Sequence, residues 1–123
     1  MTNVKQIIFS FYLFLVFANF ANAQTVIKFD YDADLKAKLY KKLRNQTLNF
    51  SKKQFDSVFF DYFRKEANKK VLLTKDEYYN YTIRIAIYSE KLGLLYNEQK
   101  KDAQQSKKDW YEKMYQDYVN SKK

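Results

Sequence analysis

The near absence of proline and glycine constrains this chain more than any other feature of its sequence. Among 123 residues there is no proline and a single glycine, Gly93. Turn-rich β folds rely on these two residues, because glycine tolerates positive φ and proline fixes φ in tight turns. The sequence therefore predicts an all-α protein, built as a small bundle of three to four helices.

The first 23 residues have the three parts of an export signal. Residues 1–6 are polar and carry one positive charge, at Lys5, and residues 7–20 are apolar in twelve of fourteen positions. Ala21-Asn22-Ala23 then supplies the small-x-small pattern that a signal peptidase cuts after. We expect a signal peptide over residues 1–23, cleavage after Ala23, and a protein that works in the periplasm or is secreted.

An uncleaved membrane anchor is the alternative for this segment. A spanning helix needs about 20 predominantly apolar residues, whereas the apolar run has 14. Asn19 and Asn22 also place polar side chains where an anchor would still be apolar. The pattern favours cleavage. Because this is the only long apolar run in the chain, we expect no transmembrane segment after signal cleavage.

The remaining residues, 24–123, are enough for one domain and too few for two. They carry 22 basic and 14 acidic side chains, a net charge of +8. Such a charge attracts anionic partners, which for an exported protein means an anionic envelope polymer, lipid headgroups or another protein. The same lysines also keep helix surfaces hydrated, so net charge alone identifies neither a ligand nor an oligomeric state.

The absence of cysteine and histidine removes most catalytic chemistry from consideration. Thiol nucleophiles, Ser-His-Asp triads, Cys/His zinc sites and disulfides all need one of these residues. Asp30-x-Asp32-x-Asp34 resembles the start of a calcium-binding EF-hand loop, which also needs glycine at its sixth position and glutamate at its twelfth. Those positions hold Leu35 and Lys41. We therefore predict neither a metal site nor a cofactor.

Apolar spacing predicts the helices that follow a short extended arm over residues 24–31. Leu35, Leu39 and Leu43 recur every four residues and indicate a helix over residues 33–45. The other predicted helices cover residues 52–68, 75–96 and 107–120, the last being either a separate helix or a continuation of the third.

Two capping boxes mark the starts of the second and third predicted helices. Ser51-x-x-Gln54 precedes one and Thr74-x-x-Glu77 precedes the other. In a capping box the hydroxyl side chain bonds a backbone N–H of the first turn, and the Gln or Glu side chain reaches back to the backbone of the cap. Both starts are therefore signalled by local chemistry.

The region after the third predicted helix is ambiguous. Gly93 either caps that helix or lies inside a longer one, at a cost of about 1 kcal/mol relative to alanine. Residues 97–109 contain no large apolar side chain, which predicts a solvated helix or a hinge. Ser106 is the expected cap of the last helix.

Residues 35–55 carry the steepest local excess of positive charge in the chain, because they include no acidic residue. We interpret this segment as a candidate surface for an anionic partner, with simple solvation of helices as the alternative. Nucleic-acid binding usually adds exposed aromatic residues or a recognisable module. No such module is visible, so the pattern argues against nucleic acid. The candidate side chains are Lys36, Lys38, Lys41, Lys42, Arg44, Lys52 and Lys53.

The last predicted helix carries a second candidate site, an aromatic face that follows a long polar stretch. This face could fold back onto the other helices, or it could dock into a groove on another protein. Folding back is favoured, because a large exposed aromatic patch invites aggregation. The partner-docking candidates are Trp110, Tyr111, Met114, Tyr115 and Tyr118.

The sequence favours binding over catalysis. The predicted function is that of an exported, small, basic helical protein in an envelope-associated, chaperone-like, inhibitory or accessory role, with no catalytic residue assigned. The alternative is a small carboxylate-dependent hydrolase acting on envelope or glycan substrates, because glycosidases can work with two carboxylates alone. Its candidates lie on or near aromatic helix faces and are Asp56, Asp61, Glu66, Glu77 and Glu90.

Overall fold

The computed structural model describes residues 29–123, so the expected signal peptide and residues 24–28 of the expected arm lie outside the described residues. The described part contains no strand, which confirms the predicted all-α class. None of its helices combines the length and apolar character needed to cross a membrane. The elements are α2 (Ala33–Leu48), α3 (Lys52–Ala67), α4 (Lys75–Leu95), the 3-10 turn η1 (Asn97–Gln99), α5 (Lys100–Glu112) and α6 (Tyr115–Ser121).

Both capping boxes form as the sequence predicts. The Ser51 hydroxyl accepts a hydrogen bond from the Gln54 N–H (3.1 Å), and the Gln54 side chain accepts one from the Ser51 N–H (2.8 Å). Thr74 and Glu77 repeat this exchange at 3.2 and 2.9 Å at the start of α4. The first N–H groups of a helix have no partner within the helix, so these side chains determine where α3 and α4 begin.

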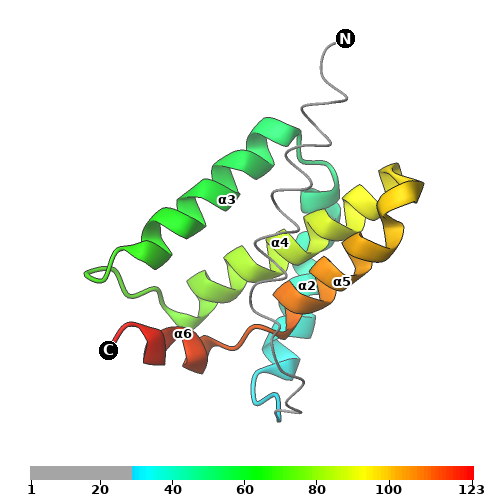
Figure 1. Ribbon diagram of the computed structural model, residues 1–123. Coiled ribbons are helices and arrows are strands. Elements are labelled where there is room, and N and C mark those ends of the chain that lie inside the picture. Colours follow the sequence, from blue (N-terminus) through cyan, green and yellow to red (C-terminus); the bar gives the residue numbers. More distant parts are fainter. Residues whose placement is uncertain (1–28) are drawn as a thin grey trace.

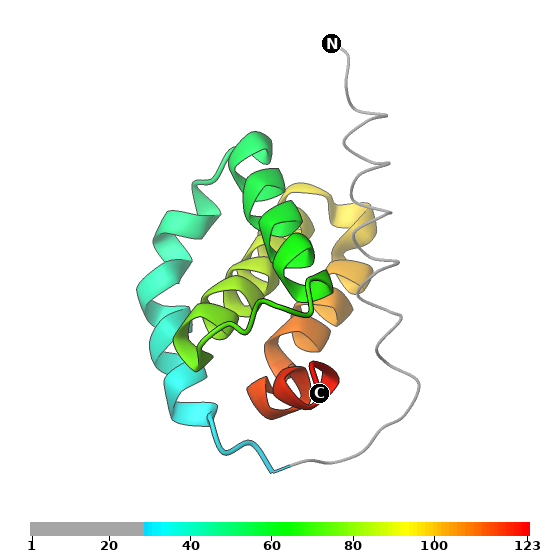
Figure 2. The ribbon, with the colours of Figure 1, turned by 90° about the vertical axis from the view of Figure 1, so that its left-hand side faces the viewer.

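α4 is the central helix of the bundle. α2, α3 and α5 all pack against it, and in Figure 1 α3 and α5 flank it on opposite sides. Figure 2 shows α2 and α3 diverging from the short connection between them, while α5 runs back beside α4. Ten of the 21 residues of α4 are buried. A helix buried on several faces belongs to the interior of a bundle rather than to its surface.

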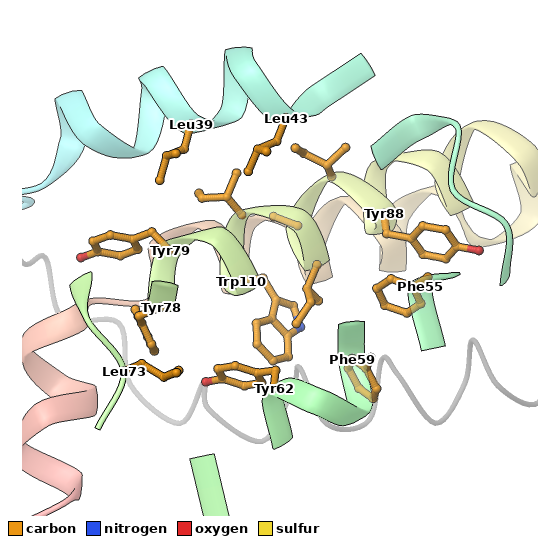
Figure 3. Packing of buried hydrophobic residues seen from close by; sticks show 14 of the residues in the cluster. Leu39, Leu43, Phe55, Phe59, Tyr62, Leu73, Tyr78, Tyr79, Tyr88 and Trp110 are labelled. Atoms are coloured by element: carbon orange, nitrogen blue, oxygen red, sulfur yellow. The ribbon is translucent and has the colours of Figure 1, made fainter. Parts of the chain in front are cut away.

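Side chains from α2, α3, α4 and α5 meet in the core, where α2 contributes Leu39 and Leu43 and the other three helices add aromatic rings (Figure 3). Phe55 of α3 stacks on Tyr88 of α4, with 3.9 Å between ring centroids. Trp110 of α5 packs edge-on against Tyr62 of α3 at 5.7 Å. Such pairs contribute about 0.5–1.5 kcal/mol each beyond the area that they bury. The chain has no disulfide, and this packing joins its helices into one core.

The last helical region differs from the prediction of one helix over residues 107–120. α5 already begins at Lys100, and an extended break at Lys113 and Met114 separates it from α6. Ser106, the expected cap, is buried in the middle of α5, where its hydroxyl lies 2.9 Å from that of Ser89. The polar residues 97–109 can pack because their contacts with α4 use small side chains. The spacing of large apolar residues does not reveal such contacts.

Gly93 lies inside α4, so the expected alternative of a helix cap is wrong. Its φ is not positive, and conformational freedom therefore does not explain the glycine. A Cβ at this position would lie 3.0 Å from the Cβ of Ala103 on α5. The glycine permits close approach of α4 and α5 at a point where the two helices have no room for a second methyl group.

Two lysines fasten connections and helix ends to the bundle. The Lys122 ammonium donates to the carbonyl oxygens of Lys65, Glu66 and Asn68, at 2.6–2.9 Å, at the C-terminal end of α3. Lys91 of α4 donates to the carbonyl oxygen of Phe50, in the connection between α2 and α3 (2.6 Å). A cation at a helix C-terminus satisfies free carbonyl groups and complements the helix dipole.

Replacing Gly93 with valine should lower the free energy of unfolding by about 2 kcal/mol, because the added side chain meets Ala103 in a packed interface. Urea unfolding followed by circular dichroism measures the change. Adding Ala103→Gly should recover part of the loss, since it removes the opposing Cβ. Additive effects of the two substitutions would contradict a direct contact between these positions.

Candidate functional site

Three exposed lysines of α2 form the most accessible basic group predicted from the sequence. Lys38, Lys41 and Lys42 are all exposed, and their spacing of three and four residues places them side by side on one face of the helix. Among residues 29–123 none of the three forms an ion pair. We refer to Lys38, Lys41 and Lys42 as the α2 lysine face.

The other four predicted basic residues separate into different environments. Arg44 pairs with Glu90, with 2.7 Å between Nη2 and Oε2. Lys52 pairs with Asp56 one turn further along α3, at 2.7 Å. Lys53 is exposed at the start of α3. The fourth, Lys36, is buried, so the seven side chains do not form one continuous surface.

Lys36 is an interior residue, which corrects its expected place on the basic surface. Its side chain has no exposed area, and its ammonium lies 3.0 Å from Oδ2 of Asp30 and 3.4 Å from the sulfur of Met114. The rings of Tyr79 and Tyr111 stand 5.3 and 5.9 Å from the same nitrogen. A buried charge needs such compensation, because removal from water costs several kcal/mol. We call these five residues the Lys36 cage.

Tyr79 connects the Lys36 cage to a second ion pair. Its hydroxyl donates to Oδ2 of Asp32 (2.6 Å) and accepts from the backbone N–H of Tyr115 (2.9 Å), while Lys75 lies 3.1 Å from Oδ1 of Asp32. Burial raises the pKa of Tyr79, as does its bond to Asp32. Burial alone would raise the pKa of Asp32, but the bonds from Tyr79 and Lys75 outweigh it and lower that pKa.

Glu90 joins α2, α4 and α5 in a half-buried polar cluster. It accepts a short hydrogen bond from Tyr40 and pairs with Arg44 and with Lys107, the latter at 2.9 Å. Lys107 also donates to the Tyr40 oxygen at 3.1 Å. Burial alone would raise the pKa of Glu90, but the bonds from Tyr40, Lys107 and Arg44 lower it to about 2. Glu90 is thus ionised at neutral pH, and its negative charge links the three helices.

Asp61 occupies a similar environment between α3 and α4. It accepts a short hydrogen bond from Tyr81 and pairs with Lys65 (3.3 Å) and Arg64 (3.4 Å). The bond from Tyr81 lowers the pKa of Asp61. Glu77, another candidate carboxylate, takes part in the capping box of α4. Asp61 therefore links α3 to α4, and Glu77 stabilises the start of α4.

Sequence reasoning missed a pair of groups at the end of α5. Burial raises the pKa of Asp109, which accepts a hydrogen bond from Gln105 (2.9 Å). Burial also lowers the pKa of Lys113, whose ammonium stands 4.8 Å over the ring of Trp110. Opposite shifts of this kind are common at functional sites and also arise from packing alone. The sequence pattern around Trp110 carries no signal for them.

The aromatic face predicted on the last helix lies against the core, split between α5, the break and α6. Trp110 and Tyr118 are buried, while Tyr111, Met114 and Tyr115 are half-buried. The backbone of Leu73, before α4, donates to the Tyr118 hydroxyl (2.9 Å) and accepts from the Tyr115 hydroxyl (2.7 Å). These contacts pack the aromatic face against the rest of the protein, so little of it remains accessible to a partner.

No known protein family, curated protein or solved structure matches the chain. Within residues 29–123 no cluster of three or more acidic side chains could hold a metal ion. Two groups of residues stand out in the part of the chain that the structure describes: the α2 lysine face on the surface and the Lys36 cage in the interior.

Replacing Glu90 with glutamine should lower the free energy of unfolding at pH 7 by about 2 kcal/mol, because Arg44 and Lys107 lose their shared anion. The folded-state pKa of Glu90 is about 2, below its ordinary value of 4.5. Its stabilisation is therefore complete above pH ~5 and is lost as the pH falls toward ~2. Urea unfolding of both proteins across this range measures the difference.

The matched control is Asp102→Asn, which neutralises an exposed acid on α5 that forms no ion pair among the described residues. This variant should track the wild type within about 0.5 kcal/mol at every pH. A stability difference between wild type and Glu90→Gln that stays constant down to pH ~2 would contradict the assigned role of Glu90.

Proposed function

We propose that this chain is a small exported protein that acts by binding an anionic polymer of the cell envelope through the α2 lysine face. The observation that supports this proposal is the grouping of Lys38, Lys41 and Lys42 on one exposed face without an ion pair among residues 29–123. Elsewhere in the same segment, Lys36 and Arg44 are neutralised by acids. The uncompensated charge of the segment is therefore concentrated on α2.

The surroundings of the α2 lysine face favour a polymer over a lipid surface. Neighbouring exposed positions on α2 carry small, polar or acidic side chains, among them Ala37, Asn45 and Asp34. Membrane-surface helices combine a basic face with large apolar side chains that enter the headgroup region. α2 has no such exposed side chain. Its lysines are suited to contact a chain of negative charges from one side.

The contacts of four of the five candidate carboxylates support binding over the alternative of a carboxylate-dependent hydrolase. Asp56, Asp61 and Glu90 are in ion pairs, and Glu77 completes a capping box. A general acid of a glycosidase needs a raised pKa so that it is protonated near neutral pH. The pKa values of Asp61, Glu77 and Glu90 are instead lowered.

Replacing Lys38, Lys41 and Lys42 together with glutamine should weaken binding to an immobilised sulfated polysaccharide, used as a model polyanion. Each amine that contacts the polymer releases counterions, so affinity depends on salt. The slope of log affinity against log salt concentration should become shallower by roughly 2, as expected when three contacts are lost. Retention on the resin across a salt series measures this slope.

The matched control removes the same charge from exposed positions outside α2, as Lys69→Gln, Lys70→Gln and Lys100→Gln. Its slope should stay close to that of the wild type. Equal losses in the two triple variants would show that net charge alone drives retention, and would contradict a site on α2. Binding to anionic lipid vesicles without binding to the polymer would replace the proposed polymer by a lipid surface.

Export is tested separately by the mass of the mature protein. Full-length chain produced in a Gram-negative host should appear in the periplasmic fraction with the mass of residues 24–123. Replacing Ala21 and Ala23 with leucine should block this cleavage, because signal peptidases require small side chains at these positions. Recovery of the wild type as an intact chain in the membrane fraction would support the uncleaved anchor instead.

A further inference from the structure

Met114 occupies an unusual position for a thioether. It lies at the extended break between α5 and α6, visible in Figure 1 as the connection between the two helices, and it is half-buried. Its sulfur accepts a hydrogen bond from the buried Lys36 ammonium at 3.4 Å. Apart from Met1 it is the only methionine, and the chain has no cysteine. Sulfur chemistry in residues 2–123 is therefore confined to this atom.

The contact between Met114 and Lys36 is a weak one that holds two distant segments. A thioether is a poor hydrogen-bond acceptor. The same ammonium binds Asp30, which precedes α2, so the Lys36 cage fastens the chain before α2 to the chain after α5. Tyr79 adds a second fastening, through its bonds to Asp32 and to the N–H of Tyr115. Any change at the sulfur acts on this junction.

We propose that Met114 is a modification site for two-electron oxidants, such as peroxides or hypohalous acids, and that its oxidation opens the junction between the chain before α2 and the α5–α6 break. With hydrogen peroxide the sulfur gains an oxygen atom and is oxidised by two electrons. The O–O bond of the peroxide breaks, and water leaves as the other product. The sulfoxide can be returned to the thioether by methionine sulfoxide reductases.

The distances within the Lys36 cage leave too little space for an oxygen atom between Lys36 and Met114. A hydrogen bond from the ammonium to a sulfoxide oxygen needs about 2.9 Å between nitrogen and oxygen. The nitrogen and the sulfur are only 3.4 Å apart, so an oxygen between them displaces one of the two groups. The Lys36 side chain has no exposed area, whereas Met114 is half-buried, so the displacement falls on Met114. Met114 must move outward, and the junction loosens.

Displacement at the Lys36 cage also affects the residues that are bonded to it. Tyr115 follows Met114 directly and holds Tyr79 through its backbone N–H. Asp30 is paired only through the Lys36 ammonium among the ion pairs of the described residues. Oxidation should therefore increase local opening in residues 30–36 and 113–118 while the core around Trp110 stays closed. Local opening of this kind is measurable by amide hydrogen exchange.

The test compares the full-length wild type with Met114→Leu before and after treatment with dilute hydrogen peroxide. Mass spectrometry of peptides confirms that one oxygen has been added at Met114. Exchange in residues 30–36 and 113–118 should become about tenfold faster in the oxidised wild type and return to its original rate after treatment with methionine sulfoxide reductase. Met114→Leu keeps the apolar volume, lacks the sulfur, and should not respond to peroxide.

A second variant removes the dependence on oxidant. Met114→Gln places a polar, flexible side chain beside Lys36 and should show the faster exchange without peroxide. Complete oxidation of Met114 with unchanged exchange in both segments would overturn the proposal. An equal response of wild type and Met114→Leu to peroxide would also overturn it, because the response would then arise at another residue.

Discussion

Buried tyrosine rings need hydrogen-bond partners for their hydroxyl groups, and this requirement organises the packing around α4. A buried phenol without a hydrogen bond costs free energy, so each ring must be placed with its oxygen toward a partner. Three tyrosines, Tyr40, Tyr79 and Tyr81, donate to Glu90, Asp32 and Asp61 respectively. Each of these carboxylates also pairs with a lysine. The three sites fasten α4 to the elements around it.

The same constraint explains how a strongly basic chain uses its lysines. Lys36, Lys91, Lys107 and Lys122 are all engaged within the fold, at carboxylates or at backbone carbonyl groups. An aromatic ring lies within 5.0–5.4 Å of each of these ammonium groups, and its negative face attracts the cation. Net charge therefore overstates the positive charge offered to a ligand. The α2 lysine face is a smaller and better defined feature than the composition indicates.

Local signals predicted much of the fold and little of the candidate sites. The capping boxes located the starts of α3 and α4, because they act over three residues of sequence. Apolar spacing did not predict the packing of α5 on α4, because the contacts between the two helices use Ala103, Ser106 and Gly93 rather than large apolar side chains. The predicted basic segment contained the α2 lysine face, but helix spacing alone could not separate it from the buried Lys36.

The helical class and two helix starts follow from local sequence, because glycine and proline usage and capping act within a few residues. Tertiary structure decided which charges became internal. Lys36 meets Met114 across 78 positions of sequence, and Arg44 meets Glu90 across 46. Such pairs form only when α2, α4 and α5 are packed together, and the buried Lys36 and the largely buried Glu90 each need a partner for their charge. The order of residues does not record that proximity, so the Lys36 cage emerges only in the folded chain.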